Sequence, residues 1–121
     1  MSKMIFVVDD NDTNLAMAEG ALEEQYKVIT LPSAARMFAM LKKITPDLIL
    51  LDIEMPETNG FEALKLLKAS DLYAGIPVIF LTGNSDAASE AYGIELGAVE
   101  SISKPFSKPA LLNRVEHHLY A

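Results

Sequence analysis

Five short apolar runs recur along the chain, separated by longer amphipathic segments. Each run is four to six residues long and is rich in leucine, β-branched or aromatic side chains. Continuous apolar runs of this length are typical of strands that are buried on both faces of a sheet. The pattern therefore predicts five strands, at Met4–Val8, Tyr26–Leu31, Leu48–Leu51, Ile76–Leu81 and Ala98–Ser103.

Helical patterns follow each of these runs. Asp12 is a suitable N-cap for a helix that runs to about Glu24, and Ser85 can cap another that runs to Leu96. Apolar residues at helical spacing predict three more helices, around Ala34–Ile44, Phe61–Leu67 and Leu111–Leu119. Strands that alternate with helices predict an α/β fold, here a (βα)5 doubly wound parallel sheet in one domain over residues 1–121.

Composition supports one globular domain and excludes several functions. The 121 residues have a mass of 13.2 kDa, and half of them are hydrophobic. The net charge of -7 disfavours direct binding to nucleic acid or to an anionic membrane, because both require clustered cations. The absence of Cys excludes disulfides, thiolate metal sites and a Cys nucleophile. No long apolar span or signal peptide is evident, so we expect a cytoplasmic protein.

Polar side chains follow four of the five predicted strands. Asp9 and Asp10 follow the first, Asp52 the third, Thr82 the fourth and Lys104 the fifth. In an open parallel sheet the functional crevice lies outside the carboxyl ends of the strands. We therefore expect these five side chains to converge at one rim.

Three carboxylates at one rim require a compensating charge. Two unit charges about 5 Å apart repel each other by roughly 3 kcal/mol at an effective dielectric constant near 20. Oxygen ligands without His or Cys favour Mg²⁺, with Mn²⁺ as a substitute. The plain alternative is that Asp9 and Asp10 form only a solvated turn and helix cap, and that Lys104 is an ordinary surface lysine. Convergence with Asp52 weakens that alternative.

The same residues suit a covalent aspartyl phosphate. Lys104 offers a positive charge to one phosphoryl oxygen and Thr82 a hydroxyl to another, while Gly83 leaves room beside the backbone. Asp52 is the candidate nucleophile, because it ends the most apolar run, which indicates the central strand.

The combination of motifs resembles the receiver domain of bacterial two-component response regulators, the family of the chemotaxis regulator. The resemblance extends from Ile5 to about Tyr120 and depends on four blocks. They are VVDDN at Val7–Asn11, LILLDIEMPETNGFE at Leu48–Glu62, FLTGNSD at Phe80–Asp86 and SKPF at Ser103–Phe106.

This resemblance implies a flavodoxin-like fold with strand order 2-1-3-4-5. It implies that Asp52 takes a phosphoryl group from a sensor histidine kinase or a phosphotransfer protein. Asp10, Asp52 and the backbone carbonyl of Glu54 would hold Mg²⁺, and Asp9 would act mainly through water. Thr82 and Lys104 would bind phosphoryl oxygens.

The resemblance also implies a phosphorylatable switch and not a turnover enzyme. An output domain or partner protein would read the switch on the face formed by the fourth helix, the fifth strand and the fifth helix. Lys104–Pro105 is expected to be a cis peptide, and Gly60 is expected to open the third helix.

The chain departs from the family pattern at one switch position. The family usually carries an aromatic residue three positions before the lysine, and this chain has Ser101 there. The output mechanism must therefore differ from the usual one. Gly83, Asn84 and Pro105 lie in the same switch region, and the side chains of Glu54 and Asn84 are expected to set how long the phosphoryl group survives.

Two other classes of function are alternatives to a phosphorylatable switch. A receiver-like protein that is never phosphorylated would bind partners by shape alone. The intact set of Asp9, Asp10, Asp52, Thr82 and Lys104 opposes this alternative, and Ser101 keeps it open. An enzyme is the third class. However, the D-x-D-x-T motif of aspartyl-phosphate phosphatases is absent, and the first loop lacks the small polar residues of a flavin phosphate site.

Overall fold

The computed structural model describes residues 3–83 and 87–120. The strands are β1 Met4–Val8, β2 Lys27–Leu31, β3 Leu48–Asp52, β4 Val78–Thr82 and β5 Glu100–Ser103. The helices are α1 Asp12–Leu22, α2 Ala34–Leu41, α3 Gly60–Lys68, α4 Ala87–Leu96 and α5 Lys108–Tyr120. Strands and helices alternate along the chain, as the sequence predicts.

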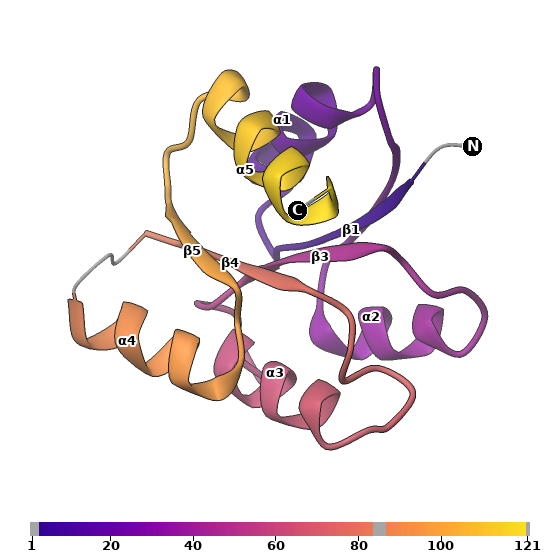
Figure 1. The fold of residues 1–121 in the computed structure, drawn as a ribbon, viewed down its shortest axis with the longest axis vertical. Helices are drawn as coiled ribbons and strands as arrows, with labels where there is room; N and C mark the ends of the chain where they lie inside the picture. The colour runs from indigo at the N-terminus through magenta and orange to yellow at the C-terminus, as the bar shows by residue number, and fades with distance from the viewer. Residues whose placement is uncertain (1–2, 84–86, 121) are drawn as a thin grey trace.

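The five strands form one parallel sheet in the order β2-β1-β3-β4-β5. Figure 1 shows α1 and α5 on one face of this sheet and α2, α3 and α4 on the other. The central strand β3 is buried along its whole length. The predicted doubly wound (βα)5 fold and its strand order are therefore confirmed.

Alternate side chains of the buried strands form two cores. Phe6, Ile49 and Phe80 face the layer of α2, α3 and α4, whereas Val7 and Leu50 face the layer of α1 and α5. Side chains of a strand alternate between the two faces of the sheet. A strand covered on both faces must therefore be apolar throughout, which explains the continuous runs in the sequence.

Several predicted boundaries are wrong by one or two residues. The fourth strand begins at Val78 and not at Ile76, because Pro77 has no backbone N–H for the ladder. The first helix is capped by Asn11, whose side chain accepts a hydrogen bond from the backbone N–H of Asn14, and not by Asp12. The predicted cap Ser85 lies outside the described residues.

Gly60 brings the start of α3 against the end of β3. Its backbone N–H donates to the carbonyl oxygen of Ile53 over 2.9 Å. A Cβ atom at this position would lie 2.5 Å from the backbone oxygen of Asp52. Asn59 and Glu62 form a reciprocal capping box around the same turn. The expectation that Gly60 opens the third helix is confirmed. Because Gly60 has no side chain, the loop after Asp52 can pack closely against the start of α3.

Within the described ranges, no helix has the length and apolar character needed to cross a bilayer.

Gly60→Ala should destabilise the fold, because the new methyl group collides with backbone atoms that cannot move independently. We expect the free energy of unfolding in urea to fall by about 1–3 kcal/mol. Gly20→Ala is the matched control: a Cβ atom at Gly20, inside α1, meets nothing within 4 Å. That substitution should raise the free energy of unfolding by about 0.5–1 kcal/mol. Equal effects of the two substitutions would contradict this account of Gly60.

Candidate functional site

The polar residues that follow the strands meet at one rim of the sheet. Asp9 and Asp10 come directly after β1, Asp52 and Thr82 end β3 and β4, and Lys104 follows β5. These four strands are neighbours and run in the same direction, so their carboxyl ends lie side by side. Asp9, Asp52 and Thr82 are almost completely buried, and Asp10 is exposed. The predicted convergence is confirmed.

Lys104 bridges two of the carboxylates. Its Nζ lies 2.9 Å from Oδ1 of Asp52 and 3.4 Å from Oδ2 of Asp9. Burial lowers the pKa of Lys104, but the bonds to the two carboxylates outweigh it and hold that pKa above its ordinary value. Lys104 therefore stays charged, and the plain alternative of an ordinary surface lysine is wrong.

Burial is the main influence on the ionisation of Asp52. It raises the pKa of this carboxyl to about 7, and the nearby charge of Asp9 adds to the rise, against the hydrogen bond from Lys104. Desolvation favours the neutral form of an acid, because its charged form loses hydration. The carboxylate of Asp52 thus lies in a position where additional positive charge would stabilise it.

The carboxylate oxygens fit a hard divalent cation. Asp9, Asp10 and Asp52 can each place one oxygen so that all three atoms lie within 4.8 Å of one another. Both oxygens of Asp9 already accept hydrogen bonds, from Lys104 and from the backbone N–H of Asn11. In contrast, Oδ2 of Asp52 is buried and accepts no hydrogen bond from the described residues. A buried carboxylate oxygen normally has a partner, and Mg²⁺ would supply one.

Thr82 lies at the same rim, but its hydroxyl has an unforeseen contact. It donates to Oε1 of Glu54 over 2.7 Å. Glu54 is exposed and follows Asp52 by two residues, so its side chain reaches across from the end of β3 to the end of β4. The sequence places both residues near the site and carries no signal that they pair. Gly83 is exposed, with open space around it; Asn84 lies outside the described residues.

The segment after β5 brings Lys104 back to the rim. Its backbone N–H donates to the carbonyl oxygen of Thr82 over 2.7 Å. The Lys104–Pro105 peptide is cis, as expected, and Pro105 is exposed. Lys104 is therefore held by its backbone as well as by its ammonium group.

Ser101 lies beside a cluster of aromatic side chains that packs against α4. It pairs with Phe80 across the β4–β5 ladder, and its buried Oγ has no hydrogen-bond partner among the described residues. The ring of Phe61 packs edge-on against both Phe80 and Tyr92, with centroids 5.4 and 4.9 Å apart. Gly93 leaves room for the ring of Phe80. The aromatic side chains of this region thus come from α3, β4 and α4 and not from β5.

Glu100, at the start of β5, binds two basic side chains of α5. Its carboxylate receives two hydrogen bonds of 2.6 Å from Arg114 and lies 2.7 Å from Nε2 of His118. Burial opposes ionisation, but the bonds from Arg114 and His118 prevail and hold the pKa of Glu100 below its ordinary value. These contacts tie α5 to the edge of the sheet.

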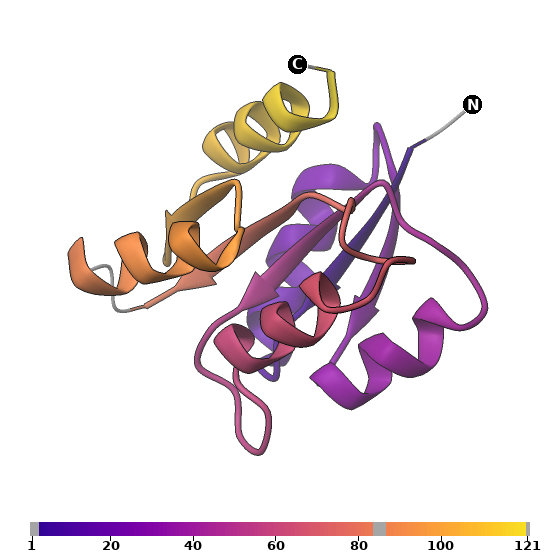
Figure 2. The same cartoon turned by 60° about the horizontal axis from the view of Figure 1, so that its bottom comes forward.

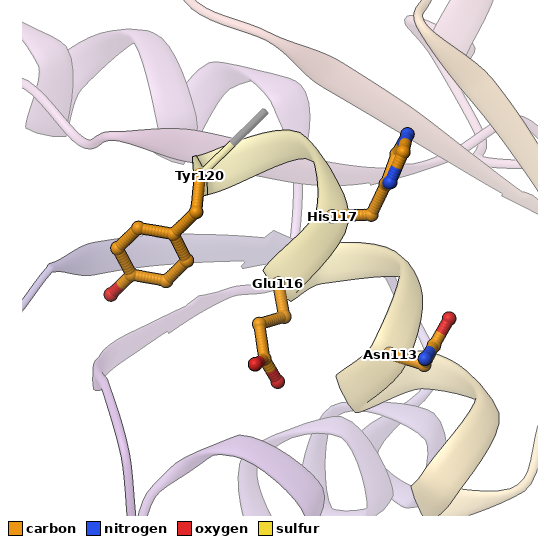
Figure 3. Close-up of a pocket in the computed structure, with 4 residues that line it drawn as sticks. All are labelled: Asn113, Glu116, His117 and Tyr120. Carbon is orange, nitrogen blue, oxygen red and sulfur yellow. The ribbon is translucent and has the colours of Figure 1, made fainter.

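A shallow hollow on α5 lies apart from the acidic rim. It is lined by Asn113, Glu116, His117 and Tyr120, whose side chains point in different directions (Figure 3). The ring of Tyr120 lies beside Lys3, which precedes β1, whereas Asp9 and Asp10 follow that strand. The hollow is therefore no part of the candidate site.

Comparison with known families gives a match over most of the chain. The family model described as "Response regulator receiver domain" matches residues 5–116. The chain is 41% identical over 115 residues, 95% of its length, to the Vibrio cholerae protein named "Probable cyclic di-GMP phosphodiesterase", of which it covers 26%. It is 35% identical over 117 residues, 96% of its length, to the phosphate regulon regulator PhoB of Pseudomonas aeruginosa, of which it covers 51%. The chain thus spans about half or less of these relatives.

Solved structures show the same fold over the whole chain. The chemotaxis protein CheY4 of Vibrio cholerae superimposes with a TM-score of 0.91 at 26% identity, and the match covers 97% of this chain and 98% of that protein. A BeF3-activated DrrB receiver domain superimposes with a TM-score of 0.88 at 29% identity over the full length of both chains.

Asp52→Asn should stabilise the metal-free chain at high pH. Between about pH 4 and 7 the folded state holds a proton on Asp52 that the unfolded state has released, so wild-type stability should fall as the pH rises. In EDTA at pH 8 we expect the substitution to raise the free energy of unfolding by about 1–3 kcal/mol, since one pKa unit is worth about 1.4 kcal/mol.

The increase in the free energy of unfolding that Asp52→Asn causes should be smaller at pH 5 than at pH 8. Denaturation in urea at both pH values measures it, and Asp71→Asn, at an exposed acid outside the site, serves as the control. A gain that is the same at both pH values would show that burial of the Asp52 charge is not its cause.

Ser101→Ala should leave stability unchanged or raise it by up to about 1 kcal/mol, because it removes a buried hydroxyl without a described partner. Ser33→Ala is the contrast. The hydroxyl of Ser33 caps α2 and accepts a hydrogen bond from the backbone N–H of Arg36, so its loss should cost about 1 kcal/mol. Thermal or urea unfolding of the two variants gives the comparison. A cost for Ser101→Ala as large as that for Ser33→Ala would show that Ser101 is hydrogen-bonded in solution.

Proposed function

Because the chain belongs to the response regulator receiver domain family, we propose that it is a signalling switch whose phosphoacceptor is Asp52. The observation that supports this role most directly is the contact of Lys104 with Asp52, which places a charged ammonium group 2.9 Å from a buried carboxylate. A sensor histidine kinase or phosphotransfer protein is the proposed donor.

In the proposed transfer, a carboxylate oxygen of Asp52 attacks the phosphorus atom of a phosphohistidine. The P–N bond breaks, and the imidazole leaves with the electron pair. The ammonium group of Lys104 stabilises the negative charge on the transferred oxygens. The hydroxyl of Thr82 binds a second phosphoryl oxygen once it turns away from Glu54. Hydrolysis of the resulting acyl phosphate by water resets the switch, so no turnover of a substrate is required.

We assign Asp10, Asp52 and the backbone carbonyl of Glu54 as the residues that would hold Mg²⁺, which Mn²⁺ can replace. The ion would neutralise charge on the phosphoryl oxygens. Asp9 is assigned an indirect role through water, because both of its oxygens already accept hydrogen bonds from the protein. Asp9 therefore orients Lys104 and the turn at Asn11.

The α4-β5-α5 face is the proposed output surface. Of the residues of α4, only Gly93 is buried in the described structure, and an element with few buried contacts opens or shifts at low cost. With Ser101 in place of the aromatic residue usual in the family, the signal must reach α4 by other side chains. Gly83, Asn84 and Pro105 are proposed to modulate switching and phosphoryl lifetime.

The wider setting is proposed from the family. We take residues 1–121 as one receiver domain that controls an output domain or a partner protein and does not itself bind nucleic acid or membrane. The regulators of similar sequence differ in kind, since one is named as a phosphodiesterase and another as a transcriptional regulator. A cytoplasmic location stays a prediction.

Phosphorylation with a small donor tests the assignment. Incubation with phosphoramidate and Mg²⁺ should add the mass of one phosphoryl group to the intact chain, and EDTA should abolish the gain. Asp52→Asn should remove it, whereas Asp71→Asn should not. Lys104→Ala should slow the reaction at least tenfold, because the charge that neutralises the phosphoryl oxygens is lost.

Two outcomes would contradict the proposal. A mass gain that survives Asp52→Asn would place the phosphoryl group elsewhere. A folded wild-type chain that gains no mass from either phosphoramidate or acetyl phosphate would support a receiver-like protein that binds partners without phosphorylation.

A further inference from the structure

One segment of this acidic chain carries only positive charge. Residues 25–46 contain no Asp or Glu and four bases, Lys27, Arg36, Lys42 and Lys43, although the whole chain has a net charge of -7. This segment forms β2, α2 and the turn after α2. Figure 2 shows α2 at the outer side of the molecule, and β2 is an edge strand of the sheet. Four of the ten bases therefore lie in a segment without acids at one edge of the molecule.

A groove crosses the surface of this basic segment. It has a volume of about 310 Å³ and lies between the end of β2 and one side of α2. Leu31, at the end of β2, and the next residue Pro32 line one side, and Arg36 and Met40 of α2 line the other with Lys43 from the turn after that helix. No acidic residue is among its described lining, and Asp9, Asp10, Asp52 and Lys104 do not take part. The groove therefore uses none of the side chains of the proposed phosphorylation site, although the carbonyl oxygen of Leu31 accepts a hydrogen bond from the backbone N–H of Asp9.

The two cations of the groove lie toward opposite ends of α2. Arg36 is in the first turn of the helix, and Lys43 is in the turn that follows its end at Leu41. Met40, which is partly buried, lines the groove together with the apolar side chains of Leu31 and Pro32. The groove therefore presents an apolar centre between two cations.

We propose that this groove binds an acidic segment of a partner protein. The segment would place one carboxylate against Arg36 and another against Lys43, with an apolar side chain between them over Met40. Charge complementarity supports this occupant. Duplex DNA and anionic membranes fit less well, because each is a large negative surface. It would extend past the few cations of the groove and be repelled by the negative charge of the rest of the chain.

A labelled helical peptide tests the groove directly. The probe is a fluorescent alanine-rich peptide with two Glu residues seven positions apart and a Leu four positions after the first Glu. Fluorescence anisotropy with the full, unphosphorylated chain should give saturable binding with a Kd below about 1 mM, weakened by salt. The double substitution Arg36→Glu with Lys43→Glu should weaken binding at least tenfold. A probe with Lys in place of both Glu residues should not bind.

The matched control changes the net charge by the same amount elsewhere. Lys65 and Lys108 are exposed and lie on α3 and α5, away from the groove. Lys65→Glu with Lys108→Glu should leave the Kd within about twofold. Chemical-shift changes in an ¹⁵N spectrum should gather at Leu31, Arg36 and Met40.

Three results would overturn the proposal. They are no saturable binding up to about 1 mM, equal losses of affinity in the two double variants, and tighter binding to phosphatidylserine vesicles or duplex DNA than to the peptide. None of them bears on phosphorylation of Asp52, which this experiment does not require.

Discussion

The burial of carboxylates at the carboxyl ends of a parallel sheet is the constraint on which this molecule depends. Asp9 and Asp52 are almost fully buried, and Lys104 is the ammonium group that touches both in the described structure. Burial, together with the charges of Asp9 and Glu54, outweighs Lys104 and raises the pKa of Asp52 to about 7. A divalent cation at this rim would offset that negative charge.

The sheet determines which side chains share this site. The sequence predicts them well, because its apolar runs all arise from burial of the strands between two layers of helices. Strands covered by helices on both faces are apolar throughout and end at the first residue that needs water or a charge. The positions of Asp52 and Lys104 at the rim therefore follow from the pattern of the sequence alone. The contact of Thr82 with Glu54 cannot be predicted in this way. Glu54 lies in a loop, where tertiary packing and not sequence spacing decides the direction of a side chain.

The groove beside α2 shows a different limit of sequence reasoning. The absence of acids between residues 25 and 46 is visible in the sequence, but the net charge of the whole chain hides it. Only the fold brings Arg36 and Lys43 to one groove beside Leu31. A net charge of -7 excludes a chain that is basic overall, not one with a basic face. Charge therefore has to be considered by segment as well as in sum.

Ser101 of β5 pairs with Phe80 of β4, and the aromatic contacts with α4 come from α3. Gly60 lies against the backbone of Asp52, and the next residue, Phe61, packs on Tyr92 of α4 and on Phe80 of β4. These contacts form a continuous path from the loop after Asp52 to α4 through α3. Ser101 is too small to fill that role from β5. Phe61 therefore joins the start of α3, beside the loop after Asp52, to both β4 and α4.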